Sequence, residues 1–193
     1  TNTRITVTNA ISKSEADEII SYTDSQVTLE KVTDKSSSIS ELNSLGNSVV
    51  TIQNADITVT DEVGLEVTQS INQMTDGKVT LQAAIDTYAN LIKIGEINPD
   101  FVSINNATVH ATDNLDLTKL LALRELTDTK VIIDELSEIK TNLISIISTF
   151  DDLVLSDTNI NVLDNVNRSD AEIIDSYNNN SGIAVSYTHL RAH

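Results

Sequence analysis

The sequence predicts an α/β fold, and more specifically an α/β solenoid in which strand–helix–strand coils stack so that their strands form a parallel sheet. One phrase recurs as TDSQVTL, TDGKVTL and TDTKVII at intervals of 52 residues, starting at Thr23, Thr75 and Thr127. Apolar positions keep the same step, and the hydrophobic period within each repeat alternates between that of a strand and that of a helix. Two such apolar series are Ile19, Ile71 and Leu123, and Val50, Val102 and Val154.

The first half of each repeat is predicted to contain a strand followed by a helix. ITVT at 5–8 alternates apolar and β-branched polar residues, as strands do, and it returns as ITVT at 57–60, as VHAT at 109–112 and, one residue early, as INVL at 160–163. Asn9, Asp61 and Asp113 follow these segments and are residues that commonly open helices. We therefore expect each of them to cap the helix that follows, which should end near Tyr22 in the first repeat.

The second half of the repeat is predicted to form a similar coil. It contains a strand at 26–29, a helix at about 36–45, a strand at 49–52 and a polar turn, QNAD, at 53–56. Val27 and Val50 lie 23 residues apart and relate the two halves. The Thr-Asp pair should end the first helix and turn the chain into the next strand.

Two further expectations concern the register of the strands. Ile5, Ile57 and Val109 should belong to one ladder, with members two coils apart. In the last full repeat the alternation of Leu153 and Leu155 conflicts with the 52-residue step, which lands on Val154. A slip of one residue is therefore expected there, and such a slip exchanges the two faces of a strand.

The repeat defines the expected domain organisation. A single solenoid array should cover residues 1–185, with repeats at about 5–56, 57–108, 109–159 and a partial one at 160–185. The string SYTHLRAH at 186–193 resembles translated adapter read-through at the ends of metagenomic gene fragments, so it is treated as a non-native tail. Because the chain begins at Thr1 without a signal-like segment, we expect it to be a piece of a longer protein.

The composition argues against several classes of partner. The 12 Lys and Arg residues are outnumbered by 29 Asp and Glu residues, and the formal charge of −17 repels phosphate backbones and anionic lipids. No apolar run approaches the roughly 18 residues of a membrane helix. We therefore expect neither nucleic acid binding nor membrane insertion. Aromatic residues make up only 3% of the chain, so small aliphatic side chains should form its core.

No catalytic, cofactor-binding or metal-binding residue is predicted, and the chain is expected not to be an enzyme. There is no cysteine, and with the tail excluded His110 is the one histidine available as a base. His110 takes the outward position that Thr6 and Thr58 hold in the other repeats, which favours an exposed substitution. The five glycines form no phosphate-binding loop, and no HExxH motif occurs.

Two alternatives for binding stay open. Asp24, Asp76 and Asp128 recur in every repeat and could bind calcium along one edge, although helix ends and turns explain the same residues. Threonines on outward strand faces could present a flat surface to a glycan or an ice-like lattice, although Thr also suits any exposed strand. These threonines are Thr6, Thr8, Thr28, Thr51, Thr58, Thr60 and Thr80.

The segment IQNADITVTD at 52–61, followed by a helix with a polar start and then by TDGKVTLQA, resembles repeats of very long secreted or cell-surface proteins of marine cyanobacteria and related bacteria. The resemblance covers residues 1 to about 185 and rests on the rhythm of the repeat. It implies a stalk, adhesive or surface-layer segment of a giant protein at an extracellular or cell-surface location. The glycine-rich calcium motifs of such proteins are missing from this chain.

The leading functional hypothesis is a non-enzymatic structural or adhesive repeat segment, with neighbouring repeats of the same parent chain and glycan or protein surfaces as its partners. The alternative is a specific protein- or glycan-binding solenoid module, which predicts an exposed patch that breaks the repeat. A polysaccharide-active enzyme fragment ranks last, because it would require carboxylates or basic residues clustered in the cleft of one coil.

Overall fold

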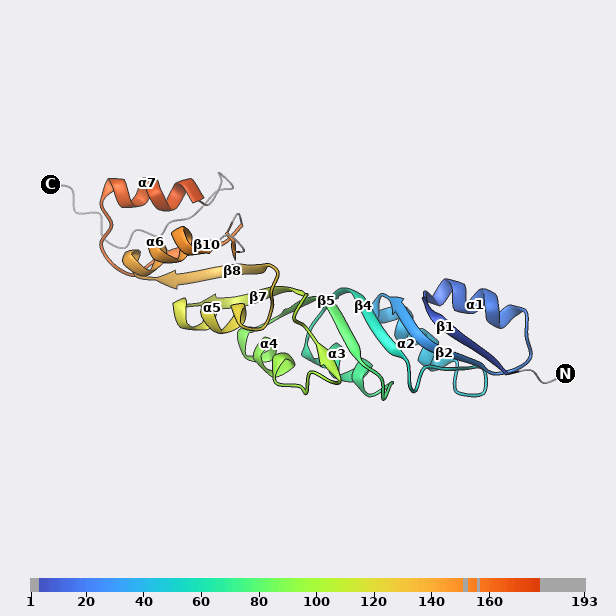
Figure 1. Cartoon of the computed structure of the whole chain (residues 1–193). Coiled ribbons are helices and arrows are strands. Elements are labelled where there is room, and N and C mark those ends of the chain that lie inside the picture. The colour runs from blue at the N-terminus through green and yellow to red at the C-terminus, as the bar shows by residue number, and fades with distance from the viewer. Residues whose placement is uncertain (1–3, 151–152, 156, 178–193) are drawn as a thin grey trace. The chain divides into compact units, whose positions relative to one another are not determined.

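The computed structural model describes residues 4–150, 153–155 and 157–177, and it confirms the α/β class (Figure 1). Within these residues, strands that run parallel to their partners alternate with helices in an open sheet. The chain forms two compact units, Thr1–Ala84 with Lys93–Asn106 and Ile85–Ile92 with Ala107–His193, here called the first and second unit. The expectation of one array over residues 1–185 stays a prediction, and the tail at 186–193 lies outside the described residues.

The elements follow the order of the repeat. The first part of the chain forms β1 (Ile5–Ile11), α1 (Lys13–Ser21), β2 (Val27–Asp34), α2 (Ser36–Ser44), β3 (Val50–Thr51), β4 (Asp56–Val63), α3 (Leu65–Asn72), β5 (Val79–Asp86), α4 (Tyr88–Gly95) and β6 (Val102–Ser103). It continues with β7 (Thr108–Leu115), α5 (Leu117–Arg124), β8 (Val131–Glu138), α6 (Lys140–Thr149), β9 (Leu153–Val154), β10 (Asn159–Val162) and α7 (Arg168–Tyr177).

The long strands extend past the segments predicted from alternation. β2 runs for eight residues, and its burial places Val27, Leu29 and Val32 inside but both Glu30 and Lys31 outside. The pairing of β1 with β2 shifts register at the same point of the strand. Two neighbouring outward residues interrupt the period of two, which is why the alternating pattern alone ends the strand too early.

The register shows how the coils stack in the first unit. Ile5 pairs with Val27 and Val27 with Val50, so β1, β2 and β3 form one column. The predicted ladder from Ile5 to Ile57 is wrong, because Ile57 pairs instead with Val32, in the second half of β2. The turn between β3 and β4 displaces the following strand along the sheet, so β2 is partnered by β3 over its first half and by β4 over its second half.

The register slip expected at β9, in the last full repeat, is confirmed. Val27 pairs with Val50 and Val79 with Val102, whereas Val131 pairs with Leu153. Leu155 is buried, and Val154 lies beside Ile132, which is half-buried. The coil is one residue shorter than its counterparts, and inward placement of the two leucines preserves the apolar face.

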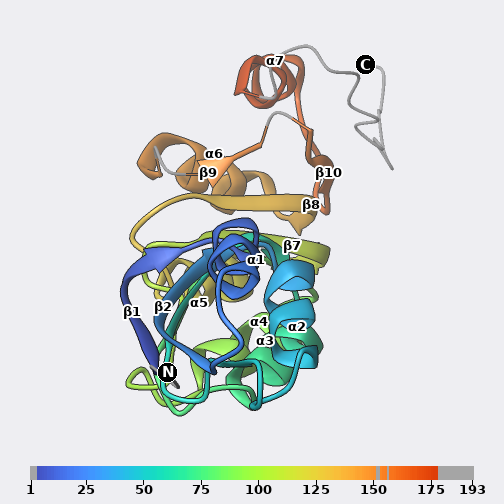
Figure 2. The same ribbon diagram turned by 90° about the vertical axis from the view of Figure 1, so that its right-hand side faces the viewer.

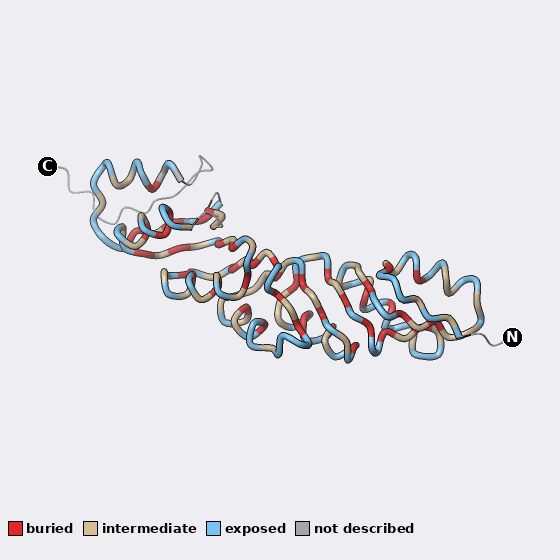
Figure 3. The backbone as a smooth tube through the Cα atoms, viewed as in Figure 1, coloured by how far each residue is buried: buried red, intermediate tan, exposed pale blue. Residues whose placement is uncertain are grey.

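Small aliphatic side chains form the core, as the composition predicts. Helices α1 and α2 lie on the same side of β1 and β2 (Figure 2). Buried residues follow the strands and the strand-facing sides of the helices (Figure 3), for example Ala16, Ile39 and Leu42 on the helices. Among the residues whose burial is described, no tyrosine or phenylalanine is buried. The core is therefore filled by valine, isoleucine and leucine side chains that pack closely against one another.

The threonine of the repeated phrase has the structural role expected of it and also joins two coils. Thr75 and Thr127 each follow a helix and are buried. The Thr75 hydroxyl donates to the carbonyl oxygen of Ala55 at 2.6 Å and accepts from the Gly77 N–H at 2.9 Å. Thr127 makes the same bond to Ala107 at 2.5 Å. The hydroxyl thus closes the turn and ties it to the chain of the neighbouring coil.

The prediction that Asn9, Asp61 and Asp113 cap the helices that follow them is wrong. Asn9 lies inside β1, and Ser12 caps α1. Asp61 and Asp113 lie inside β4 and β7, which continue to Val63 and Leu115 before α3 and α5 begin. Each carboxylate instead accepts from the first N–H of the helix in the preceding coil. Asp61 accepts from the Ser36 N–H at 2.7 Å and from the Ser36 hydroxyl at 2.7 Å, and Asp113 accepts from the Tyr88 N–H at 2.6 Å.

The same cap recurs at three more coil boundaries. The backbone N–H groups of Lys13, Leu117 and Lys140 donate to carboxylates at 2.8, 3.0 and 2.7 Å, and their acceptors are Asp34, Glu138 and Asp164 respectively. Each acceptor lies at or just after the end of a strand, where the chain passes the amino end of the previous helix. A negative charge at this end also interacts favourably with the helix dipole.

Replacement of Asp61 tests the cap. Asp61→Ala removes the acceptor of both Ser36 bonds and should lower the free energy of unfolding by about 1–2 kcal/mol. Asp61→Asn, which keeps an oxygen acceptor but loses the charge, should cost less. Urea unfolding followed by circular dichroism measures both changes. Asp76→Ala is the matched control, since Asp76 is exposed and should change stability by less than about 0.5 kcal/mol; equal losses at the two positions would contradict the cap.

Acid should weaken the Asp34 cap. Partial burial raises the pKa of Asp34, but hydrogen bonds from the Lys13 and Lys35 N–H groups and the Ser38 hydroxyl outweigh it and hold the pKa below its usual value. A lowered pKa gives stability that is present above the unfolded-state pKa of about 3.9 and is lost as the pH falls through the folded value. The stability difference between the wild type and Asp34→Asn should therefore be constant from about pH 7 to pH 5 and shrink below about pH 4. Urea titrations across this range test it, and a difference that persists at about pH 2 would refute the linkage.

Candidate functional site

The outward face of the sheet carries the candidate site in the first unit. Thr6, Thr28 and Thr51 pair in register across β1, β2 and β3. Thr33, Thr58, Thr80 and Ser103 form a second row across β2, β4, β5 and β6. The predicted threonine ladder is thus present at Thr6, Thr28, Thr51, Thr58 and Thr80, whereas Thr8 and Thr60 are exposed at the register irregularities and are not in these rows.

The second unit replaces the hydroxyl row with different side chains. His110, Ile132 and Val154 occupy the corresponding positions on β7, β8 and β9. His110 lies outward, as expected, and is half-buried, with its Nε2 atom 2.7 Å from an oxygen of Asp134. Apolar neighbours on the strands and one carboxylate therefore surround this histidine, and no serine or threonine nucleophile bonds to it among the described residues.

The column of recurring aspartates does not gather into an ion site. Asp24, Asp76 and Asp128 are all exposed, one in each turn after a helix. In the part of the chain that the structure describes, no group of three or more His, Cys, Asp and Glu side chains is arranged to hold a metal ion. A calcium ion is normally held by six to eight oxygen ligands, several of them carboxylates of one loop.

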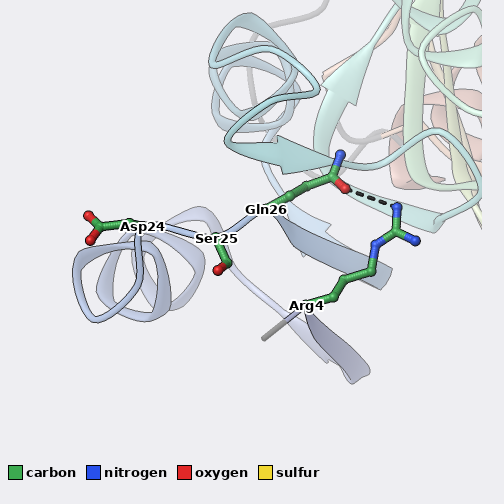
Figure 4. Close-up of a pocket in the computed structure, with 4 residues that line it drawn as sticks. All are labelled: Arg4, Asp24, Ser25 and Gln26. Atoms are coloured by element: carbon green, nitrogen blue, oxygen red, sulfur yellow. Dashed lines mark hydrogen bonds between the residues drawn. The ribbon is translucent and has the colours of Figure 1, made fainter. Parts of the chain in front are cut away.

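A shallow hollow adjoins the threonine row at the amino-terminal coil. It has a volume of about 400 Å³, and its polar lining includes Arg4, Thr6, Gln26, Thr28, Glu30 and Thr51. A second, smaller depression is lined by Arg4 and Gln26 as well as by Asp24 and Ser25. The Asp24 carboxylate points away from the Arg4 and Gln26 side chains (Figure 4). The repeat pattern points to the threonines and Asp24, whereas it does not mark Arg4 and Gln26.

Two hydrogen bonds fix the side chains at the centre of the hollow. The Arg4 guanidinium donates to the Gln26 side-chain oxygen at 3.0 Å (Figure 4), and the Gln26 amide nitrogen donates to the Asn47 carbonyl oxygen. The Val27 N–H in turn donates to the Val49 carbonyl oxygen at 2.9 Å, so the strand beneath Gln26 is itself paired. The hollow therefore presents hydroxyl, amide, guanidinium and carboxylate groups on a rigid sheet.

This arrangement suits hydrogen bonding rather than proton transfer. None of the residues that line the hollow is a histidine, and the carboxylate in its lining, Glu30, is exposed to solvent rather than buried as a general acid or base usually is. The one signal in the sequence that could have revealed the hollow is the repeat itself. The 52-residue step carries Arg4 to Asp56 and Gln26 to Lys78, so these positions change charge between repeats.

Comparison of the chain with known protein families, characterised proteins and solved structures finds no match to any of them. Among the described residues, no helix is both long enough and apolar enough to cross a membrane.

Calcium should leave the stability unchanged, because the exposed aspartates of the turns are not gathered around a common point. The midpoint of thermal unfolding in millimolar calcium should equal that in magnesium at the same ionic strength and that in EDTA with added sodium chloride. The ionic strength must be matched because a formal charge of −17 makes any cation stabilising by screening. A saturable rise with calcium alone would show a site and overturn this expectation.

Proposed function

We propose that the chain is a non-enzymatic structural and adhesive repeat segment of a large extracellular or cell-surface protein. The observation that supports this most directly is the recurrence of one set of contacts from coil to coil. At five boundaries a carboxylate in the last residues of a strand or just after it bonds to the helix of the preceding coil, and parallel strand ladders join coils within each unit. Because each coil contacts only its neighbours through the same bonds, repeats can be added to such an array without changes to the existing coils.

The resemblance to repeats of long surface proteins supports the location, and the acidic composition suits a solvated array. Its partners would be neighbouring repeats of the parent chain and glycan or protein surfaces on the outward face. Side chains on this face vary between repeats, as Thr28, Thr80 and Ile132 show, while the inward positions stay aliphatic. The outward face can therefore bind different surfaces in different repeats, while the aliphatic core stays the same.

A second candidate, a specific binding module, is favoured by the hollow at Arg4 and Gln26. It predicts an exposed patch that breaks the repeat, and the exchange of Arg4 for Asp56 and of Gln26 for Lys78 fits this description. The enzymatic alternative lacks comparable support, since the lining of the hollow offers no pair of carboxylates placed as acid and base.

Insertion of an extra repeat tests the structural role. A second copy of residues 57–108, placed between Thr108 and Val109, preserves the phase of the repeat. The lengthened chain should unfold cooperatively, with an unchanged or higher midpoint and the same circular dichroism per residue, because every coil keeps an equivalent neighbour.

The matched control inserts a scrambled version of the same 52 residues at the same place, which should lower the midpoint. The maximum dimension from small-angle X-ray scattering should rise for the in-phase insertion. If both insertions destabilise the chain equally, the array interpretation is wrong. Release of reducing ends from polysaccharides by the purified chain would show that it is an enzyme instead.

A further inference from the structure

We propose that the hollow beside the Thr6–Thr28–Thr51 row binds a neutral oligosaccharide, here called the saccharide hollow. The inference rests on the proposed adhesive function and names the ligand class that the first unit would recognise. It concerns the outward face of β1, β2 and β3 and the turn after β3, all within the first unit.

The hollow offers polar groups that the protein itself does not use. Among the described residues, the side chains of Thr6, Thr28, Glu30 and Asn54 make no hydrogen bond, although all four line the hollow. Arg4 has five N–H donors, and one guanidinium nitrogen is bonded to Gln26. Hydroxyls that both donate and accept, together with planar amide and guanidinium groups, match the alternating donors and acceptors of a sugar.

The strand pairing sets the backbone positions of the three threonines before any ligand arrives. Neighbouring strands lie about 4.8 Å apart, so the paired threonines form a straight row at that spacing. Val27 and Leu29, which flank Thr28 on β2, are fully buried and anchor the strand in the core. A row fixed in this way loses little conformational entropy on binding, which favours affinity for an extended chain.

The charge of the chain disfavours anionic ligands, and the lining of the hollow adds little net charge of its own. The formal charge of −17 repels polyanions such as uronate or sulfated chains from the whole protein. Within the hollow, the positive Arg4 and the negative Glu30 offset one another, so the lining is locally balanced. A cationic ligand would meet the Arg4 guanidinium, and a neutral chain of hydroxyl groups meets no repulsion.

The hollow belongs to one repeat. At the next step of 52 residues, Asp56 replaces Arg4, Lys78 replaces Gln26, and Pro99 replaces Asn47. The Asp56 carboxylate is engaged by the Lys78 N–H at 3.0 Å. In the following repeat, Ile132 replaces Thr28. The chain therefore supplies its own control positions, which share the backbone of the hollow but lack its chemistry.

The test uses the full chain labelled with ¹⁵N and titrated with cellohexaose, maltohexaose and laminarihexaose. At least one neutral probe should give saturable shifts of backbone amides in the strands that form the hollow, at residues 4–6, 26–30 and 49–54. An affinity in the millimolar to submillimolar range is expected for an open site of this size, corresponding to a free energy of about −4 to −5 kcal/mol.

Variants separate the hollow from general surface binding. Arg4→Ala and Gln26→Ala should each weaken binding about tenfold, because each removes hydrogen-bonding groups of the site. Lys78→Ala, at the position equivalent to Gln26, should change the affinity less than about twofold. Circular dichroism and the undisturbed amide spectrum of the second unit establish that each variant is folded.

Three results would overturn the proposal: no saturable shift with any of the three probes, equal weakening by Lys78→Ala, or tighter binding of an oligogalacturonate than of the neutral chains. Each leaves the repeat insertion experiment unaffected. The saccharide hollow can thus fail while the structural array stands. Failure of the array would appear in the insertion variant, whatever the outcome of the titration.

Discussion

The fold depends on a hydrogen bond between coils, in which a carboxylate near the end of a strand accepts from the first N–H of the helix in the preceding coil. The helices have eight to ten residues and would be marginal in isolation. Their amino ends carry N–H groups without partners in the helix, and a carboxylate from the next coil supplies an acceptor and a favourable charge. The contacts of Asp34, Asp61, Asp113, Glu138 and Asp164 therefore make the order of the five helices that they cap depend on the coil that follows.

This dependence gives part of the acidic composition a structural role. A carboxylate that caps a helix is stabilising while it is ionised, whereas the surplus of negative charge repels itself. Lys13 and Lys140, whose N–H groups are capped in this way, also place their ammonium groups near Asp17 and Asp170. The threonine hydroxyls of Thr75 and Thr127 complete the set of bonds between coils without adding charge. The same elements suit an array that is assembled coil by coil.

On each strand the inward side chains form the core and the outward side chains form the surface, so the surface can change between repeats while the core is kept. Inward positions such as Val27, Val79 and Val131 are fully buried and keep one size and polarity. Their half-buried outward neighbours are Thr28, Thr80 and Ile132, so the residue type on this side changes in the third repeat. The proposed saccharide hollow uses this freedom at a single coil, where Arg4 and Gln26 interrupt the repeat.

The sequence by itself determined the α/β class, the 52-residue repeat, the turn role of the Thr-Asp phrase, the outward threonines and even the slip that brings Leu153 inward, because these follow from period and spacing. The tertiary structure decided which elements touch. Spacing suggested that Asp61 and Asp113 open their own helices, but a capping side chain can accept from any N–H within reach, and the nearest one belongs to another coil. The partner of Ile57 and the meeting of Arg4 with Gln26 were likewise set by how far a turn displaces one strand along the next, which no local pattern encodes.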